Sequence, residues 1–133
     1  RGQTPWTPAV SVLFGLEESL KQMLSEGMQA IHQRHKAIAT RVRNGVISLG
    51  LELFARDQTY ASDTVTAVKI PENVKADDLL GTLRSQHDVV LAGGQGPHME
   101  GKIFRIGHLG FVDSSDVEDV ITALDATLAG LRA

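Results

Sequence analysis

The residue whose type and position most clearly point to chemistry is Arg105, at the centre of the apolar stretch KIFRIGHLG (102–110). A guanidinium is a planar fork of donors, so it matches a carboxylate through two parallel hydrogen bonds. A strand would hold this fork rigidly, and Gly107 and Gly110 leave space beside it. The alternative is structural: an ion pair, or an arginine stem lying along apolar surface at a strand edge. Composition alone favours the structural alternative, and the residues leave both open.

The stretch AGGQGPHMEGK (92–102) contains two glycine patterns associated with phosphate binding. GPHMEGK (96–102) fits G-x-x-x-x-G-K, but Ile103 stands where a phosphate-binding loop needs Ser or Thr, and a strand rather than a helix is expected to follow. AGGQG (92–96) lacks the strand–turn–helix context of a dinucleotide site. We therefore interpret this stretch as a connection between two strands, whose glycines allow backbone to approach a ligand or a neighbouring domain closely.

Histidine and carboxylate pairs are weaker signals. His32 and His35 share a helix face, but a metal site needs a third or fourth ligand. Asp77–Asp78 and the pair Asp113 and Asp116 lie at expected helix starts, where the helix dipole explains them without catalysis. The sequence has no cysteine, which excludes disulfides, thiolate metal ligands and cysteine nucleophiles. We expect no metal site, and no Ser-His-Asp arrangement can be assembled.

The totals describe an ordinary globular domain. The chain has 133 residues, of which 42% are hydrophobic and 22% charged, and its formal net charge is −3. This charge gives no reason to expect nucleic acid as a partner, and no apolar run reaches the ~18 residues of a membrane span. The chain begins at Arg1 without an initiator methionine or a recognisable signal peptide, so we expect a processed or truncated product. We also expect a cytoplasmic location.

The first 50 residues predict two helices or one kinked helix over residues 8–49. Thr7 has the right type for an N-cap, with Pro8 at the first helical position. Gly27 interrupts the apolar spacing, and Gly50 stops it in the position after the C-cap. These helices are long for so small a core, so we expect them to pack on something outside the chain. Trp6, Val10 and Phe14 should then be exposed.

The remaining residues predict short strands at 51–54, 64–70, 89–92 and 102–110, and helices at 75–87 and 113–133. Ser115 and Glu118 have the spacing of a capping box at the start of the last helix. Short strands with helices to one side predict a two-layer α+β domain with a mainly antiparallel sheet. We expect Arg105 near the end of its strand, pointing out of the core and without a full set of carboxylate partners.

Six segments, in this order, carry a resemblance to a known family: TPAVSVLFGLEESL, EGMQAIHQRHKAIATRVR, LGLELFA, TVTAVKIP, VVLAGGQGP and GKIFRIGHLG. Together they resemble the C-terminal part of class V aminotransferases that use pyridoxal phosphate. The most similar branch is the alanine–glyoxylate and serine–glyoxylate aminotransferase group, which includes cyanobacterial proteins named soluble hydrogenase small (42 kDa) subunit. The resemblance covers essentially the whole chain, and AGGQGPHMEGKIFRIGHLG (92–110) is its most specific part.

The resemblance implies a role for two residues. Arg105 matches the arginine that binds the α-carboxylate of the amino-acid or keto-acid substrate. Thr7 matches a threonine that reaches the phosphate of the cofactor, pyridoxal 5′-phosphate, in the neighbouring subunit of a homodimer. Some members carry a tyrosine three residues before this threonine, where this chain has Thr4, so a cofactor role for Thr4 is not carried over.

The resemblance also implies an absence. The lysine that binds the cofactor covalently belongs to a larger domain upstream, and no lysine of this chain lies in a matching context: Lys21, Lys36, Lys69, Lys75 and Lys102. We therefore expect residues 1–133 to be one C-terminal small domain, with connecting helices over 1–50 and an αβ core over 51–133. The parent would transfer an amino group between a small amino acid, alanine or serine, and a keto acid such as glyoxylate, and this chain alone would be inactive.

One alternative comes from another class of protein. Residues 64–131 are expected to follow the order β-α-β-β-α, which is close to a ferredoxin-like or ACT-like core. Arg105 would then hold the carboxylate of an effector in a stand-alone regulatory domain that binds a small amino acid. The sequence does not determine which amino donor and acceptor the implied aminotransferase would use.

Overall fold

The computed structural model describes residue 2 and residues 4–132. The chain divides into two units, residues 1–34 and residues 35–133, which are considered separately. Helix α1 (Val10–Glu26) belongs to the first unit, and helix α2 (Met28–Ser48) continues from the first into the second. Gly27 separates the two helices with φ of 86°, so the predicted interruption at this glycine is confirmed.

The start of α1 differs from the prediction. Its N-cap is Ala9, with no side-chain hydrogen bond to the first turn, so the prediction that Thr7 caps this helix is wrong. The ψ of Ala9 is 72°, which is not helical, and the helix therefore begins only at Val10. Trp6, Val10 and Phe14 are exposed, as the sequence predicts, and no residue of α1 is buried.

The end of α2 follows the sequence signal closely. Gly50 adopts φ of 73°, and its amide donates to the carbonyl of Ile47 while the amide of Leu51 donates to that of Val46. This pair of bonds is the Schellman arrangement, in which a left-handed glycine lets the chain turn back and satisfies the last carbonyls of a helix.

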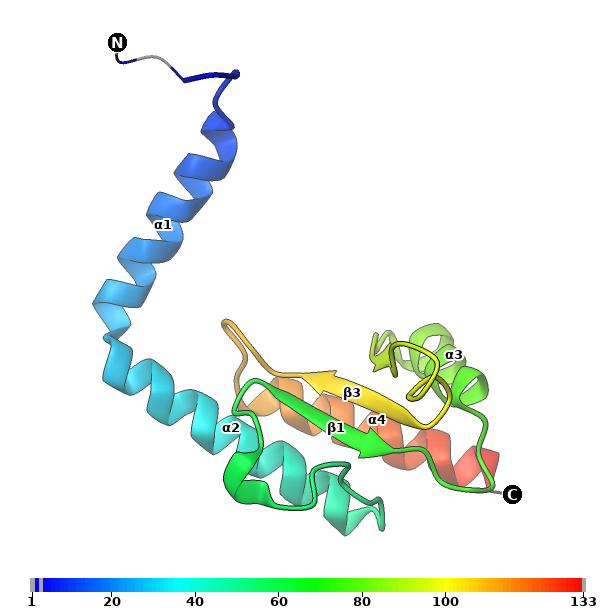
Figure 1. The fold of residues 1–133 in the computed structure, drawn as a ribbon. Coiled ribbons are helices and arrows are strands. Elements are labelled where there is room, and N and C mark those ends of the chain that lie inside the picture. The colour runs from blue at the N-terminus through cyan, green and yellow to red at the C-terminus, as the bar shows by residue number, and fades with distance from the viewer. Residues whose placement is uncertain (1, 3, 133) are drawn as a thin grey trace. The chain divides into compact units, whose positions relative to one another are not determined.

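The second unit contains a three-stranded antiparallel sheet (Figure 1). Its strands are β1 (Val65–Lys69), β2 (Ala92–Gly93) and β3 (Ile103–Gly107), in the spatial order β1-β3-β2. The predicted fold class, a two-layer α+β domain with an antiparallel sheet, is confirmed. Strand β3 is central, so both of its edges are paired.

Three of the strand predictions need correction. Residues 51–54 form no strand; Leu53 makes an isolated bridge to Val68. The strand predicted at 89–92 is displaced, since β2 begins at its last residue. The strand predicted over 102–110 ends at Gly107, because its pairing with β1 stops at Val65. Short apolar runs predict that a strand exists better than where its hydrogen bonds end, since those depend on the partner strand.

Two helices complete the second unit: α3 (Ala76–His87) and α4 (Ser114–Leu131). The last residue of the predicted helix 113–133, Ala133, lies outside the described residues. A short 3₁₀ turn over Gln58–Tyr60 lies in the loop before β1. Asp77 and Asp78 lie in the first turn of α3, where the helix dipole favours negative charge, as expected.

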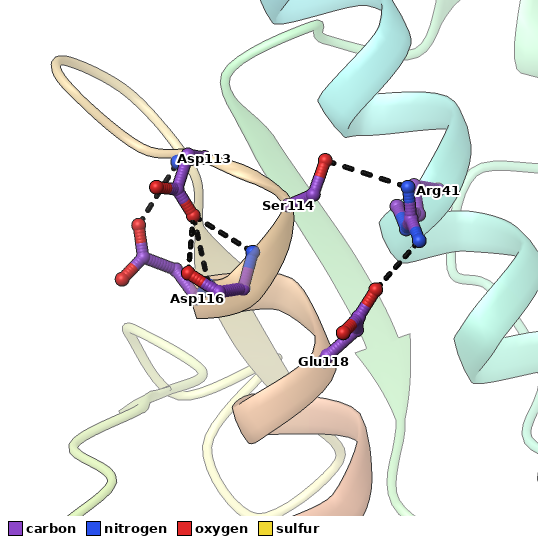
Figure 2. A network of polar contacts seen from close by, with 6 residues as sticks. Arg41, Asp113, Ser114, Asp116 and Glu118 are labelled. Atoms are coloured by element: carbon purple, nitrogen blue, oxygen red, sulfur yellow. Dashed lines mark hydrogen bonds and ion pairs between the residues drawn. The ribbon is translucent and has the colours of Figure 1, made fainter.

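The capping box of α4 lies two residues before the predicted one. The carboxylate of Asp113 accepts hydrogen bonds from the amides of Ser115 and Asp116, and that of Asp116 accepts one from the amide of Asp113. Figure 2 shows this closed ring of bonds at the start of α4. The predicted pair Ser115 and Glu118 is wrong, because the helix begins at Ser114. Glu118 instead forms an ion pair with Arg41 of α2, at 2.6 Å.

The core lies against one face of the sheet. Phe104 and Ile106 of β3, with Thr66 and Val68 of β1, are buried on that face. Their apolar side chains join one cluster with residues of α2, α3 and α4: Val42, Val46, Leu79, Leu83, Val117, Leu124 and Leu128. Alternate residues of β3 lie on the other face, and Arg105 is one of them. No described helix is both long enough and apolar enough to cross a membrane.

Candidate functional site

Arg105 is the middle residue of β3, so the prediction that it lies near the end of a strand is wrong. The register pairs it with Ala67 of β1 on one side and Ala92 of β2 on the other. Directly opposed residues of antiparallel strands have their Cβ atoms about 5 Å apart. Two methyl side chains therefore flank the arginine in the neighbouring strands.

One hydrogen bond orients the half-buried side chain of Arg105. Its Nε donates to the carbonyl oxygen of Gly93 at 3.1 Å. Across residues 2 and 4–132, no carboxylate lies within ion-pair distance of this guanidinium, and no hydrogen bond involves its two terminal nitrogens. Other arginines of the same unit are paired: Arg41 with Glu118 and Arg43 with Asp63. The terminal nitrogens of Arg105 are therefore available to a planar anion.

A cavity of about 520 Å³ adjoins Arg105 at the edge of the sheet. The segment from Asp88 to Ala92, residues Arg105 to Gly107 of β3, and the first turns of α4 line it. Most of the lining from residues 89–92 is apolar, and Asp116 and Asp119 contribute carboxylates on the side of α4. Arg105 is thus one of the residues that line a cavity large enough for a small molecule.

Thr7, the other residue that the resemblance implicates, lies in the first unit. It is exposed in the extended segment before α1, and its hydroxyl makes no hydrogen bond to any other residue within the described part of the chain. Thr4, three residues earlier, donates its hydroxyl to the carbonyl of Trp6 at 2.7 Å. Thr7 and Arg105 belong to different units, residues 1–34 and residues 35–133, so each is described within its own unit.

The glycine-rich stretch is a connection between β2 and β3, as predicted. The amide of Met99 donates to the carbonyl of Gly96, and the amide of Lys102 donates to that of Met99. These bonds close two turns, and Ile103 then begins β3 rather than a helix. The geometry of a phosphate-binding loop is therefore not formed here, because that loop needs a helix N-terminus after it.

Sequence reasoning missed the buried polar residues, of which His108 is the least exposed. It follows Phe104 and Ile106 at a spacing of two, so alternation along the strand was the signal that could have placed it on the buried face. Its side chain is 2% exposed, and its Nε2 lies 2.9 Å from the hydroxyl oxygen of Thr66. Burial is the main cause that lowers the pKa of His108, and the charge of Arg43 acts in the same direction.

Comparison with known proteins gives the context for this geometry. No family model matches the chain. The small subunit of the soluble hydrogenase of Synechococcus sp. is 43% identical over 128 residues, which are 96% of this chain and 33% of that protein. The serine–glyoxylate aminotransferase of Hyphomicrobium methylovorum is 34% identical over 128 residues, which are 96% of this chain and 31% of that protein.

Among solved structures, the pyridoxamine–pyruvate aminotransferase of Mesorhizobium loti matches with a TM-score of 0.92 at 34% identity, over 98% of this chain and 33% of that one. This chain is homologous to class V aminotransferases. Its fold is that of their C-terminal small domain. The resemblance in the sequence is thus confirmed, and these relatives give no support to an ACT-like regulatory domain. The chain spans about a third of the length of these two curated relatives.

Proposed function

We propose that this chain is the small domain of a pyridoxal-phosphate-dependent aminotransferase that moves an amino group between alanine or serine and a keto acid such as glyoxylate. Relatives with aminotransferase names and the close match of folds support an aminotransferase domain. The choice of substrates follows the serine–glyoxylate name of one relative group and is the finer part of the proposal. The rest of the enzyme, including the lysine that carries the cofactor, lies outside residues 1–133 in this proposal.

The observation that carries the proposal is the guanidinium of Arg105, which is held in the middle of a strand and whose terminal nitrogens have no hydrogen-bond partner among residues 2 and 4–132. A half-buried cation without a counter-ion costs stability unless a ligand or solvent compensates it. The α-carboxylate of an amino acid or keto acid is such a ligand, and the fork of Arg105 matches it bidentately. In this role Arg105 binds and orients the substrate, which lowers the entropic part of the barrier.

The cofactor would supply the electron sink that amino-group transfer requires. Among the described residues, Thr7 could contribute to binding the cofactor phosphate. Its exposed hydroxyl makes no hydrogen bond to another described residue. A single hydroxyl can donate one hydrogen bond to a phosphate but cannot hold the whole group. Thr7 is therefore proposed to complete the phosphate site of a neighbouring subunit in a homodimer.

The lysines of the chain support the view that it is inactive alone. Lys21 forms an ion pair with Glu17 at 3.0 Å, and Lys69 forms one with Glu52. Mixing the chain with pyridoxal phosphate should therefore give only weak, unsaturable absorbance from scattered surface lysines. A stoichiometric adduct at a single lysine, mapped by mass spectrometry after borohydride reduction, would contradict this part of the proposal.

The decisive experiment replaces Arg105 by lysine in the full-length aminotransferase. Lysine keeps the charge but lacks the planar fork. Because hydrogen bonds to charged groups contribute about 1.5–3 kcal/mol, kcat/KM for the amino donor should fall about ten- to a hundred-fold. The spectrum of the bound cofactor should stay as it is, since Arg105 is not proposed to touch it.

The matched control is Arg56→Lys, the same exchange at an exposed position of the loop before β1. It should leave both quantities unchanged. If Arg105→Lys leaves kcat/KM unchanged, or if it also removes the cofactor, Arg105 is not the carboxylate-binding residue.

Two further parts of the proposal concern context. The chain has no cysteine, which is compatible with a reducing compartment, and we include a cytoplasmic location. The hydrogenase name of the Synechococcus relative finds no chemical counterpart in residues 1–133, since they contribute no thiolate to an iron–sulfur or nickel–iron centre.

A further inference from the structure

The plane in which Arg105 presents its terminal nitrogens depends on more than the strand that carries it. An arginine side chain is long and loses much of its rotamer freedom when it is held in one conformation. Strand β3 fixes only the direction in which this side chain leaves the backbone. The second point of attachment is the hydrogen bond of 3.1 Å from its Nε to the carbonyl oxygen of Gly93.

This bond has a consequence for recognition. A guanidinium can receive a carboxylate side-on, through Nε and one terminal nitrogen, or end-on, through both terminal nitrogens. Gly93 occupies the Nε–H of Arg105, so the end-on pair remains for a ligand. Because the guanidinium is planar, the Cδ–Nε bond and the direction of Nε–H together define the plane in which the two terminal nitrogens lie.

The carbonyl of Gly93 is itself held in place by the next residue. The amide of Gly94 donates to the carbonyl of Ile103 at 2.9 Å. A Cβ atom at Gly94 would lie 2.0 Å from the carbonyl oxygen of Met99 and 2.5 Å from its carbonyl carbon. These are backbone atoms, so no rotation of a side chain could relieve the clash. Only glycine fits where the end of β2 touches the turn at Met99.

We propose that Gly94 is a positioning residue for substrate binding. Its close approach to Met99 fixes the carbonyl of Gly93, and that carbonyl orients Arg105 for end-on binding of a carboxylate. The inference rests on the proposed function, since it assigns a purpose to the orientation of Arg105 only if Arg105 binds the substrate. It also gives a role to the glycine-rich stretch 92–102, which does not have the geometry of a phosphate-binding loop.

The test is Gly94→Ala in the full-length aminotransferase, with steady-state kinetics for amino donor and keto acid. A methyl group at this position must push β2 away from Met99 and shift the Gly93 carbonyl. Misplacement of a binding group by about 1 Å can cost up to a hundred-fold, so KM for both substrates should rise at least about ten-fold. The value of kcat should fall as well, by a smaller factor than KM rises, because Arg105 both binds the substrate and orients it.

The matched control is Gly81→Ala in α3, where an added Cβ meets no atom within 4 Å. It should leave KM unchanged. A second readout separates positioning from a general structural effect: Gly94→Ala should add little to Arg105→Lys, because lysine has no Nε–H fork for Gly93 to orient. Effects that multiply in the double variant would overturn the inference, since residues that act independently are additive.

Two outcomes distinguish the inference from the function on which it rests. An unchanged kcat/KM in Arg105→Lys overturns the proposed function and this inference together. If kcat/KM falls in Arg105→Lys but KM is unchanged in Gly94→Ala, the inference is overturned and the proposed function is not.

If Gly94→Ala fails to fold, Leu80→Ala takes its place, because Leu80 packs against Gly93 from α3, with its Cδ1 3.5 Å from where a Cβ of Gly93 would lie. It should raise KM about two- to five-fold, as a smaller misplacement of the same binding group. That effect too should vanish in the Arg105→Lys background, and its persistence there would count against the inference.

Discussion

Helices α1 and α4 carry the same kind of sequence pattern but meet different surroundings. Both have apolar residues at helical spacing. Helix α4 buries its apolar face, with Val117, Leu124 and Leu128 among its buried residues, whereas α1 has no buried residue. Periodicity therefore predicts that a helix has a face to bury, but it does not predict what covers that face.

The starts of the two helices differ in the same sense. The capping box of Asp113 and Asp116 satisfies the first amides of α4, and Arg41 of α2 reaches Ser114 and Glu118 in its first turns (Figure 2). Helix α1 begins at Val10, and its N-cap, Ala9, offers no side-chain hydrogen bond. Helix α4 is thus stabilised at its N-terminus by the capping box and along its face by burial in the core. Helix α1 has neither a side-chain cap nor a buried residue.

The largest expected difference comes from one substitution made in each helix. Leu124 is 0% exposed and Leu24 is 79% exposed. Leu124→Ala should lower the free energy of unfolding by about 2–5 kcal/mol, and Leu24→Ala should change it by no more than about 0.5 kcal/mol. Urea unfolding followed by circular dichroism measures both. Equal losses would show that another copy of the chain covers α1 in solution, and sedimentation would then reveal the oligomer.

The contact between α4 and α2 supplies a second test. A Cβ atom at Gly45 of α2 would lie 2.7 Å from Cδ1 and from Cγ1 of Ile121 of α4. Gly45→Ala should therefore destabilise the unit by about 1–3 kcal/mol through overpacking. In an Ile121→Ala background the same change should instead stabilise it, by up to about 1 kcal/mol, from helix propensity alone. Destabilisation by the same amount in both backgrounds would mean that the two helices do not meet at this glycine.

The stability of the core beneath α4 should also depend on pH. Helix α1 should contribute no such dependence, because none of its residues is buried. His108 adjoins Val117 and Ile121 of α4 around a cavity of about 350 Å³, and burial lowers its pKa. The unfolded chain therefore binds the proton more readily, so the free energy of unfolding should fall as pH decreases below about 6.5.

His108→Gln should remove that part of the pH dependence between about pH 5 and 7.5, where a histidine titrates. His98→Gln, at an exposed position of the turn before β3, is the control and should keep the full pH dependence. If the slope survives in His108→Gln, another group is responsible for it.

The smallest expected effects are at the two helix starts. Asp113→Ala should slightly lower the melting temperature and speed amide exchange in the first turn of α4. Its pKa is lowered by hydrogen bonds from Ser115, so this stabilisation should fade as pH falls through that pKa. Ala9→Asp should have the opposite effect on α1, where a new cap contributes about 0.5–1 kcal/mol. Slower amide exchange at the start of α1 would show the gain, and no change would mean that capping does not limit this helix.

The predictions from sequence succeed where the determinants are local. Gly27 and Gly50 mark the helix breaks that the structure has, because a glycine at positive φ needs no tertiary partner to end a helix. The strands around 64–70 and 103–107 also follow from β-branched and apolar runs. The predictions at Thr7, at Ser115 and over 51–54 fail, because a difference of one or two residues in where an element begins changes which side chain caps or pairs.

At the candidate site, too, the sequence predicts what is local and misses what depends on distant segments. That Arg105 is a carboxylate-binding candidate follows from its side-chain chemistry and its apolar neighbours in the sequence. Its cross-strand partners Ala67 and Ala92, and the Gly93 carbonyl that orients it, were not foreseen. Each of these lies at least 12 residues away along the chain, and strand register alone decides that they meet Arg105.

The sequence by itself determined the types of the main elements, the breaks at Gly27 and Gly50, and the presence of a cation suited to a carboxylate. Only the tertiary structure decided that Arg105 lies in the central strand, that His108 is buried against Thr66, and that Gly94 must lack a side chain. The physical reason is the range of the interactions. Backbone preferences and caps act over a few residues, whereas burial, register and backbone contact are set by segments that meet only in the folded chain.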